Sequence, residues 1–192
     1  MRTDPQKTVT LVLGGARSGK SRYAQELASA FKRVVFIATA RRDDAEMRAK
    51  IARHRRERPA SWKTLELSTG LDRALREQCR KADLLIIDCL TLYLAKAMER
   101  KRGDRRQVHN HIQSLCEAIR EAKASVVIVS NEVGCGVVPS YRSGREYRDL
   151  LGEFNRQIAQ VADRVILMVA GLPLAVKDSS VGPKIAGKKG KR

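Results

Sequence analysis

The sequence predicts an α/β fold in which a mostly parallel sheet is covered by helices on both faces. Apolar runs of strand length alternate along the chain with segments of helical periodicity. A glycine-rich turn joins the first apolar run to the first helical segment. The chain has 192 residues, a length that suits one domain with a sizeable core better than two.

Six strands are expected from short apolar runs: Val9–Leu13, Arg33–Ala38, Trp62–Glu66, Leu84–Asp88, Ser125–Ser130 and Arg164–Val169. Between them, apolar residues recur every three or four positions, which indicates helices. The expected helices are Lys20–Phe31, Asp43–Arg56, Leu71–Lys81, Leu90–Arg102, Arg105–Lys123 and Gly144–Ala162. Ligands of such folds bind at the carboxyl ends of the strands, so polar residues that follow a strand are the candidate site residues.

The charge balance is strongly basic, because 39 Lys and Arg face 21 Asp and Glu and give a net charge of +18. Such a surplus favours polyanionic partners: nucleotides, phosphorylated metabolites or nucleic acid. Aromatic residues make up only 4% of the chain, too few for a platform that stacks single-stranded bases. We therefore expect residues 1–177 to form one domain, and the basic segment 178–192 to be a disordered tail whose contacts with nucleic acid are at most non-specific.

Membrane insertion and secretion are not expected. The longest uncharged apolar stretch, Val165–Val176, contains Gly171 and Pro173 and is shorter than the roughly 20 residues of a membrane helix. The first residues lack the apolar region of a secretory signal, so we expect a cytoplasmic protein. The cysteines form no C-x-x-C pair and are expected to be reduced and buried: Cys79, Cys89, Cys116 and Cys135.

The segment that follows the first strand has the phosphate-loop pattern G-x-x-x-x-G-K-S. Its residues are Gly14, Gly15, Ala16, Arg17, Ser18, Gly19, Lys20 and Ser21. In this pattern backbone N–H groups wrap the phosphates of a nucleotide, Lys20 reaches the outer phosphates, and the Ser21 hydroxyl ligates Mg²⁺. The competing interpretation is a glycine-rich turn that only precedes a helix.

A Mg²⁺ site beside a phosphate loop needs a carboxylate at the end of another buried strand, and Asp88 provides one. The alternative role of Asp88 is to cap the helix that begins near Leu90. Asn131 and Glu132 also follow a buried strand. They lie either at the edge of the active site or in a loop that packs at a subunit contact, and the sequence favours neither.

His54 lies in a run of arginines, Arg53–Pro59, at the end of an expected helix. Neighbouring guanidinium groups favour a neutral imidazole, which can attack phosphorus and form a phosphoramidate. The alternative is a solvated basic helix end that complements the helix dipole. His109 and His111 lie in a polar helical stretch and are interpreted as surface residues.

In order and spacing, these motifs resemble the bifunctional adenosylcobinamide kinase and adenosylcobinamide-phosphate guanylyltransferase family of cobalamin biosynthesis. The resemblance covers Val9–Lys177 and depends on the phosphate loop together with Phe36–Ala40, His54–Pro59, Trp62–Thr64, Asp88–Thr91, Ser130–Gly134, Gly136–Pro139 and Gly152–Gln157. It implies a P-loop NTPase with a RecA-like sheet, assembled as a homotrimer. It also implies that Asp88 is the family's strand-end carboxylate.

The resemblance further implies two reactions. ATP or GTP first phosphorylates adenosylcobinamide, and GMP from GTP then passes through a covalent guanylyl-histidine at His54 to the adenosylcobinamide phosphate. The positions implied near the guanine nucleotide are Thr39, Ala40, Arg55, Arg56, Glu57, Arg58 and Glu66. Two alternatives stay open: a P-loop kinase of another small metabolite without a covalent histidine, and a RecA-like nucleic-acid-binding ATPase.

Overall fold

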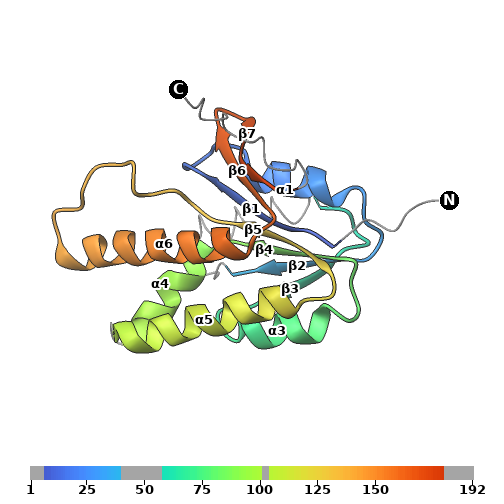
Figure 1. The fold of residues 1–192 in the computed structure, drawn as a ribbon, viewed down its shortest axis with the longest axis horizontal. Helices are drawn as coiled ribbons and strands as arrows, with labels where there is room; N and C mark the ends of the chain where they lie inside the picture. Colours follow the sequence, from blue (N-terminus) through green and yellow to red (C-terminus); the bar gives the residue numbers. More distant parts are fainter. Residues whose placement is uncertain (1–6, 40–57, 101–103, 180–192) are drawn as a thin grey trace, which may run out of the picture.

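A seven-stranded sheet forms the centre of the computed structural model, which describes residues 7–39, 58–100 and 104–179 (Figure 1). The strands are β1 Val9–Gly14, β2 Val34–Ala38, β3 Lys63–Glu66, β4 Leu84–Asp88, β5 Ser125–Val129, β6 Arg164–Val169 and β7 Leu172–Asp178. Their order is β3-β2-β4-β5-β1-β6-β7. The first six pair in parallel and β7 is antiparallel to β6. The predicted mostly parallel sheet is confirmed.

Helices cover both faces of the sheet, as predicted. They are α1 Lys20–Ala28, α3 Leu71–Gln78, α4 Leu90–Arg100, α5 Arg105–Glu121 and α6 Arg142–Val161. Helix α1 packs on one face, and α3, α4, α5 and α6 pack on the other (Figure 1). Helix α5 begins where Asp104 caps it, because the Asp104 carboxylate accepts a hydrogen bond of 3.2 Å from the Gln107 N–H. The expected helix Asp43–Arg56 lies outside the described residues.

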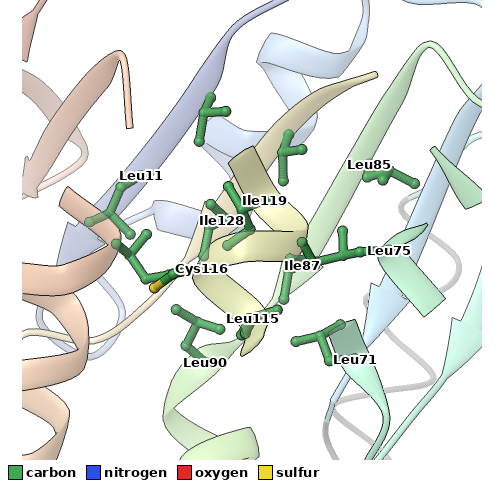
Figure 2. Packing of buried hydrophobic residues seen from close by; sticks show 14 of the residues in the cluster. Leu11, Leu71, Leu75, Leu85, Ile87, Leu90, Leu115, Cys116, Ile119 and Ile128 are labelled. Atoms are coloured by element: carbon green, nitrogen blue, oxygen red, sulfur yellow. The ribbon is translucent and has the colours of Figure 1, made fainter. Parts of the chain in front are cut away.

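The strands supply both cores, because successive side chains of a strand point to opposite faces. In β1, Leu11 faces the larger core, under the four helices, whereas Val12 faces α1. Figure 2 shows strand residues such as Ile87 and Ile128 meeting helix residues such as Leu75 in the larger core. Each fully buried side chain of this kind stabilises the fold by about 1.5–3 kcal/mol. The sheet is therefore rigidly held, and its carboxyl edge is a fixed platform.

The last strand, β7, is absent from the sequence prediction. Ala170 and Gly171 have φ values of 51° and 84°, so they form a two-residue turn of the kind that closes β-hairpins. Pro173 is tolerated because β7 lies at the edge of the sheet. The Ser179 N–H donates to the Asp163 carbonyl, so the folded part reaches beyond the predicted boundary at residue 177. Residues 180–192 of the expected tail lie outside the described part.

Two further sequence expectations concern the membrane and the cysteines. Within the described residues, none of the helices has the length and apolar character needed to cross a membrane. Cys79 and Cys116 are buried and Cys89 is half-buried, and all are free thiols. Cys135 is exposed, so the expectation of burial is wrong for this residue. It lies in a glycine-flanked loop after β5, where no helix or strand covers it.

Candidate nucleotide site at the carboxyl edge of the sheet

The predicted phosphate loop joins β1 to α1 at the carboxyl edge of the sheet. Gly14 has a φ of 149°, and a Cβ there would lie 2.6 Å from the Met168 carbonyl oxygen. Gly19, with a φ of 94°, turns the chain into the first residue of α1, and Arg17 is also in the left-handed region at 57°. Only glycine fits the space and dihedral angle at position 14. The glycines of the motif are therefore required by the shape of the loop.

Lys20 is the centre of this loop. Its side chain is only 8% exposed, and its ammonium donates to the Gly15 carbonyl at 2.5 Å and to the Ser18 hydroxyl at 3.4 Å. Gly15, Ala16 and Arg17 are exposed, so the backbone of the loop is accessible to an anion. Phosphate oxygens compete well for an ammonium held this way, because a cation binds an anionic oxygen more strongly than a neutral carbonyl oxygen.

The β6–β7 hairpin also contacts the phosphate loop and holds it in place. The Gly171 N–H, at the tip of the hairpin, donates to the Ser18 carbonyl at 3.1 Å. The Met168 carbonyl on β6 also lies against Gly14. Sequence reasoning missed this support, because it did not predict β7 and no local pattern links residues that are so distant in the chain.

Asp88 lies at the end of β4, separated from β1 by the single strand β5. The sheet register places Asp88 level with Val129 and Val129 level with Val12. At about 4.8 Å per strand, the Asp88 Cα is roughly 10 Å from the Val12 Cα, near the end of β1. Helix α4 begins at Leu90, so the N-cap position directly before it is Cys89. Asp88 lies one residue before that position, so it is not the N-cap residue.

Thr39 holds the end of β4 in place. Its hydroxyl donates to the Cys89 carbonyl at 2.6 Å and accepts from the Cys89 N–H at 2.8 Å, while its N–H donates to the Asp88 carbonyl. Thr39 is 3% exposed. Burial raises the pKa of the Cys89 thiol, and the Asp88 charge raises it further, which favours the neutral form. The visible action of Thr39 is to fix the Asp88–Cys89 segment.

Glu132 contacts the phosphate loop and Asn131 lies directly before it, a placement that the sequence left open. The Glu132 N–H donates to the Gly14 carbonyl at 3.0 Å. The Asn131 N–H donates to the Thr91 hydroxyl, and the Asn155 amide donates to the Asn131 carbonyl, both at 3.0 Å. Thr91, Asn131 and Asn155 all belong to motifs that the sequence analysis singled out. Their spacing along the chain did not predict that they contact one another.

Of the other predicted residues, only Arg58 and Glu66 lie in the described part of the chain, and they lie in different places. Arg58 lies over the ring of Phe36, 3.4 Å from its centroid, on the face that carries α1. Glu66 is exposed at the end of β3, with β2, β4 and β5 between β3 and β1. At about 4.8 Å per strand, Glu66 is roughly 19 Å from the phosphate loop. The structure does not bring Glu66 and Lys20 together. Five predicted residues lie outside the described part: Ala40, His54, Arg55, Arg56 and Glu57.

His111 is not the surface residue expected from the sequence. Its Nε2 lies 2.5 Å from the Tyr93 hydroxyl, and the two rings stack with centroids 5.2 Å apart. Burial raises the pKa of Tyr93 to about 12. The pair lines a cleft of about 460 Å³ with Ser68, Thr69, Ala97 and Arg100. His109 does lie at the surface, with its Nε2 3.3 Å from Glu153. Periodicity alone did not show which of the two histidines faces inward, because both lie in the same polar helical stretch.

Comparisons with known proteins agree with this geometry. The profile of the family described as cobinamide kinase / cobinamide phosphate guanyltransferase matches residues 10–176. The bifunctional adenosylcobalamin biosynthesis protein CobP of Pseudomonas aeruginosa is 42% identical over 168 residues, covering 87% of this chain and 96% of that protein. The bifunctional adenosylcobalamin biosynthesis protein CobU of Escherichia coli is 36% identical over 178 residues, covering 87% and 98%.

Among solved structures, an ATPase from the type III secretion system of pathogenic bacteria is similar, with a TM-score of 0.53 and 14% identity. The match covers 84% of this chain and 52% of that one, so the chain spans about half of the ATPase. At this identity the likeness shows the fold alone, and it confirms the predicted RecA-like P-loop architecture. The sequence matches show more, because they extend over almost the whole length of the two relatives at 42% and 36% identity. The chain belongs to the cobinamide kinase / cobinamide phosphate guanyltransferase family.

Proposed function

We propose that this protein phosphorylates adenosylcobinamide and then converts the product to adenosylcobinamide-GDP. The observation that carries the proposal is the phosphate loop, in which Lys20 is buried against Gly15 and Ser18 in a chain of this family. In the first reaction the aminopropanol hydroxyl of adenosylcobinamide attacks the γ-phosphorus of ATP or GTP, and the nucleoside diphosphate leaves. Lys20 and the loop N–H groups balance the charge on the transferring group.

In the second reaction a histidine carries GMP. A ring nitrogen of His54 attacks the α-phosphorus of GTP, a phosphoramidate forms, and pyrophosphate leaves. A phosphate oxygen of adenosylcobinamide phosphate then attacks the same phosphorus and releases the histidine. The covalent intermediate divides one difficult nucleotidyl transfer into two displacements. The arginines beside His54 in the sequence support the proposal, because they favour a neutral imidazole and attract a triphosphate.

The test is product analysis with the full-length protein. We expect adenosylcobinamide phosphate with ATP and Mg²⁺, and adenosylcobinamide-GDP when GTP is added, each identified by mass spectrometry. A protein that hydrolyses or binds ATP but leaves adenosylcobinamide unchanged would be a P-loop kinase of another small metabolite. Steep, salt-dependent DNA binding that survives deletion of residues 178–192 would instead support the nucleic-acid-binding ATPase, which we do not favour.

Mg²⁺ fits this site through Ser21 and Asp88. Ser21 lies in the first turn of α1 directly after Lys20, and Asp88 ends β4 two strands away from β1. A hydroxyl and a carboxylate are ligands that Mg²⁺ accepts together with water and phosphate oxygens. The ion would neutralise charge on the outer phosphates.

The Asp88→Asn variant tests this assignment. We expect the Mg²⁺ concentration needed for half-maximal nucleotide binding to rise about tenfold or more, because an amide is a weaker ligand than a carboxylate. The measurement is a titration of a fluorescent nucleotide with Mg²⁺, without corrinoid. The control is Asp149→Asn, at a surface carboxylate that is 59% exposed. An unchanged Mg²⁺ requirement in Asp88→Asn would remove Asp88 from the metal site.

A guanine-nucleotide region remains part of the proposal. It comprises Thr39, Ala40, Arg55, Arg56, Glu57, Arg58 and Glu66. Glu66 is separated from the phosphate loop across the sheet, which suits a contact with the GTP of the second reaction better than a contact with the γ-phosphate. The buried Thr39 acts in this proposal through the Asp88–Cys89 segment that it holds.

We also propose a homotrimer. Among the described residues, the exposed large apolar side chains other than Leu92 fall into two patches. The hairpin patch consists of Val169, Leu172, Leu174 and Val176, and the loop patch of Val137, Val138 and Tyr141. Leu172 and Leu174 point to one face of β7 because they are two positions apart along the strand. Figure 1 places the hairpin and the loop before α6 well apart. Two different patches suit a head-to-tail contact between copies, which closes into a ring.

The double variant Leu172→Glu/Leu174→Glu tests this assembly. We expect it to reduce the mass measured by light scattering from that of a trimer to that of a monomer, because buried charges without partners are costly. Leu92→Glu is the matched control, since Leu92 is exposed on α4 outside both patches. A trimer that persists in the double variant would contradict the assignment of the hairpin patch.

Location in the cytoplasm is likewise proposed, to be tested by cell fractionation.

A further inference from the structure

Glu132 has a fixed place beside the phosphate loop, and the reactions described above do not use it. It closely follows β5, the strand between β4, which ends at Asp88, and β1, which ends at Gly14. The carboxyl ends of parallel strands meet at one edge of a sheet. Glu132 is therefore a second carboxylate at the catalytic edge, one strand closer to the loop than Asp88.

Three consecutive main-chain groups hold this position. The Asn131 N–H donates to Thr91 on α4, the Asn131 carbonyl accepts from Asn155 on α6, and the Glu132 N–H donates to Gly14 at the end of β1. Asn155 is 5% exposed, so its amide is a buried anchor. Ordering a residue costs about 1–2 kcal/mol of backbone entropy, which these contacts offset. The chain becomes exposed from Gly134 onward, so the fixed part is the pair next to the phosphate loop.

The contact with Gly14 shows which end of the nucleotide Glu132 faces. The Lys20 ammonium lies on the Gly15 carbonyl, and the lysine of this motif contacts the outer phosphates. The Gly14–Gly15 end of the loop therefore faces the γ-phosphate. Since Glu132 is bonded to Gly14, it stands at the end where the transferable phosphoryl group and its acceptor meet.

The carboxylate is available for chemistry there. Glu132 is half-buried, and its Oε1 accepts a hydrogen bond of 2.6 Å from the Gly134 N–H. Across residues 7–39, 58–100 and 104–179, no group donates to its other oxygen, Oε2. One oxygen is thus anchored, and the second can accept a hydrogen bond from a substrate. A carboxylate that is anchored through one oxygen beside the phosphate loop, with the other oxygen open to a substrate, is suited to act as a general base.

We propose that Glu132 is the catalytic base of the kinase step, an inference that rests on the proposed phosphorylation of adenosylcobinamide. The acceptor O–H bond breaks as its oxygen bonds to the γ-phosphorus, and the proton passes to the Glu132 carboxylate. The bond from the γ-phosphorus to the β,γ-bridging oxygen breaks, and its electron pair leaves with the nucleoside diphosphate. Guanylylation of a histidine involves no alcohol, so that step does not need this base.

The test compares Glu132→Gln with wild type in both reactions. The amide keeps the size of the side chain but cannot take the proton, so we expect kcat of the kinase step to fall about 10²–10⁴-fold. The KM values for nucleotide and adenosylcobinamide should stay within about threefold, and so should the rate of GMP attachment to the protein from GTP. Glu132→Asp, which keeps the charge, should recover part of kcat. The control is Glu117→Gln, at an exposed position of α5.

Three outcomes would overturn the proposal. They are a kinase kcat within about threefold of wild type, a nucleotide KM that rises as kcat falls, and parallel loss of GMP attachment. The last two would mean that Glu132 shapes the nucleotide site without accepting a proton. If Glu132→Gln unfolds at a lower temperature than wild type, Glu132→Asp decides: a lowered kcat with unchanged KM values and unchanged GMP attachment supports the proposal, and a raised nucleotide KM or a loss of GMP attachment overturns it. Failure of the proposed function is distinct, because wild type itself would then leave adenosylcobinamide unphosphorylated.

Discussion

Replacing Lys20 with alanine is expected to lower kcat/KM for phosphorylation of adenosylcobinamide about 10²–10³-fold or more. The variant loses the ammonium that lies on the Gly15 carbonyl and the Ser18 hydroxyl. The methylene stem of Lys20 is buried, but its removal affects a loop and not the core, so the fold should survive. The measurement is steady-state kinetics with ATP, together with thermal unfolding followed by circular dichroism.

The matched control is Lys81→Ala, at a lysine that is 67% exposed after α3 and far from the loop in the chain. It removes the same charge and should leave both kinetics and stability unchanged within about 0.5 kcal/mol. Full activity in Lys20→Ala would refute the phosphate-loop assignment. Equal losses in both variants would attribute the effect to net charge.

His54→Ala is expected to abolish covalent attachment of GMP, with a fall of about 10⁴-fold or more in formation of adenosylcobinamide-GDP. No other residue of the chain is proposed to receive the guanylyl group. Phosphorylation of adenosylcobinamide should continue, because that reaction needs no covalent histidine. The measurement is the intact mass of the protein after incubation with GTP and Mg²⁺, followed by peptide mapping of the adduct.

His109→Ala is the control, because His109 lies at the surface against Glu153. The adduct should be unchanged in this variant, and in wild type it should be acid-labile and base-stable, as a phosphoramidate is. An adduct that survives in His54→Ala would place the nucleophile elsewhere. A wild-type protein that phosphorylates adenosylcobinamide without forming any adduct would reduce the function to that of a kinase.

The two predictions also separate the two halves of the proposed activity. Lys20 lies among the described residues, with its contacts to Gly15 and Ser18, whereas His54 lies outside them. The case for Lys20 therefore comes from geometry and the case for His54 from the sequence and its resemblance. For a bifunctional enzyme we expect Lys20→Ala to lose phosphorylation of adenosylcobinamide. We expect His54→Ala to keep that reaction and to lose GMP attachment.

The sequence by itself determined the local features. Val9–Leu13 and Leu84–Asp88 are short, mainly apolar runs typical of buried parallel strands, and the phosphate loop is a short motif with fixed spacing. These features depend on neighbours in the chain, so they can be read without the fold. The order of such motifs also indicated the family, which the comparisons then confirmed.

Only the tertiary structure decided which distant residues meet. Thr91 and Asn131 are 40 positions apart and Asn155 lies 24 beyond Asn131, yet all three fix the chain beside the loop. Likewise, Gly171 reaches Ser18, and His111 turns inward to Tyr93. Such contacts follow from the order of the strands and the packing of helices on them, and periodicity carries no information about either. That is why Glu132 was ambiguous in the sequence and lies beside Gly14 in the fold.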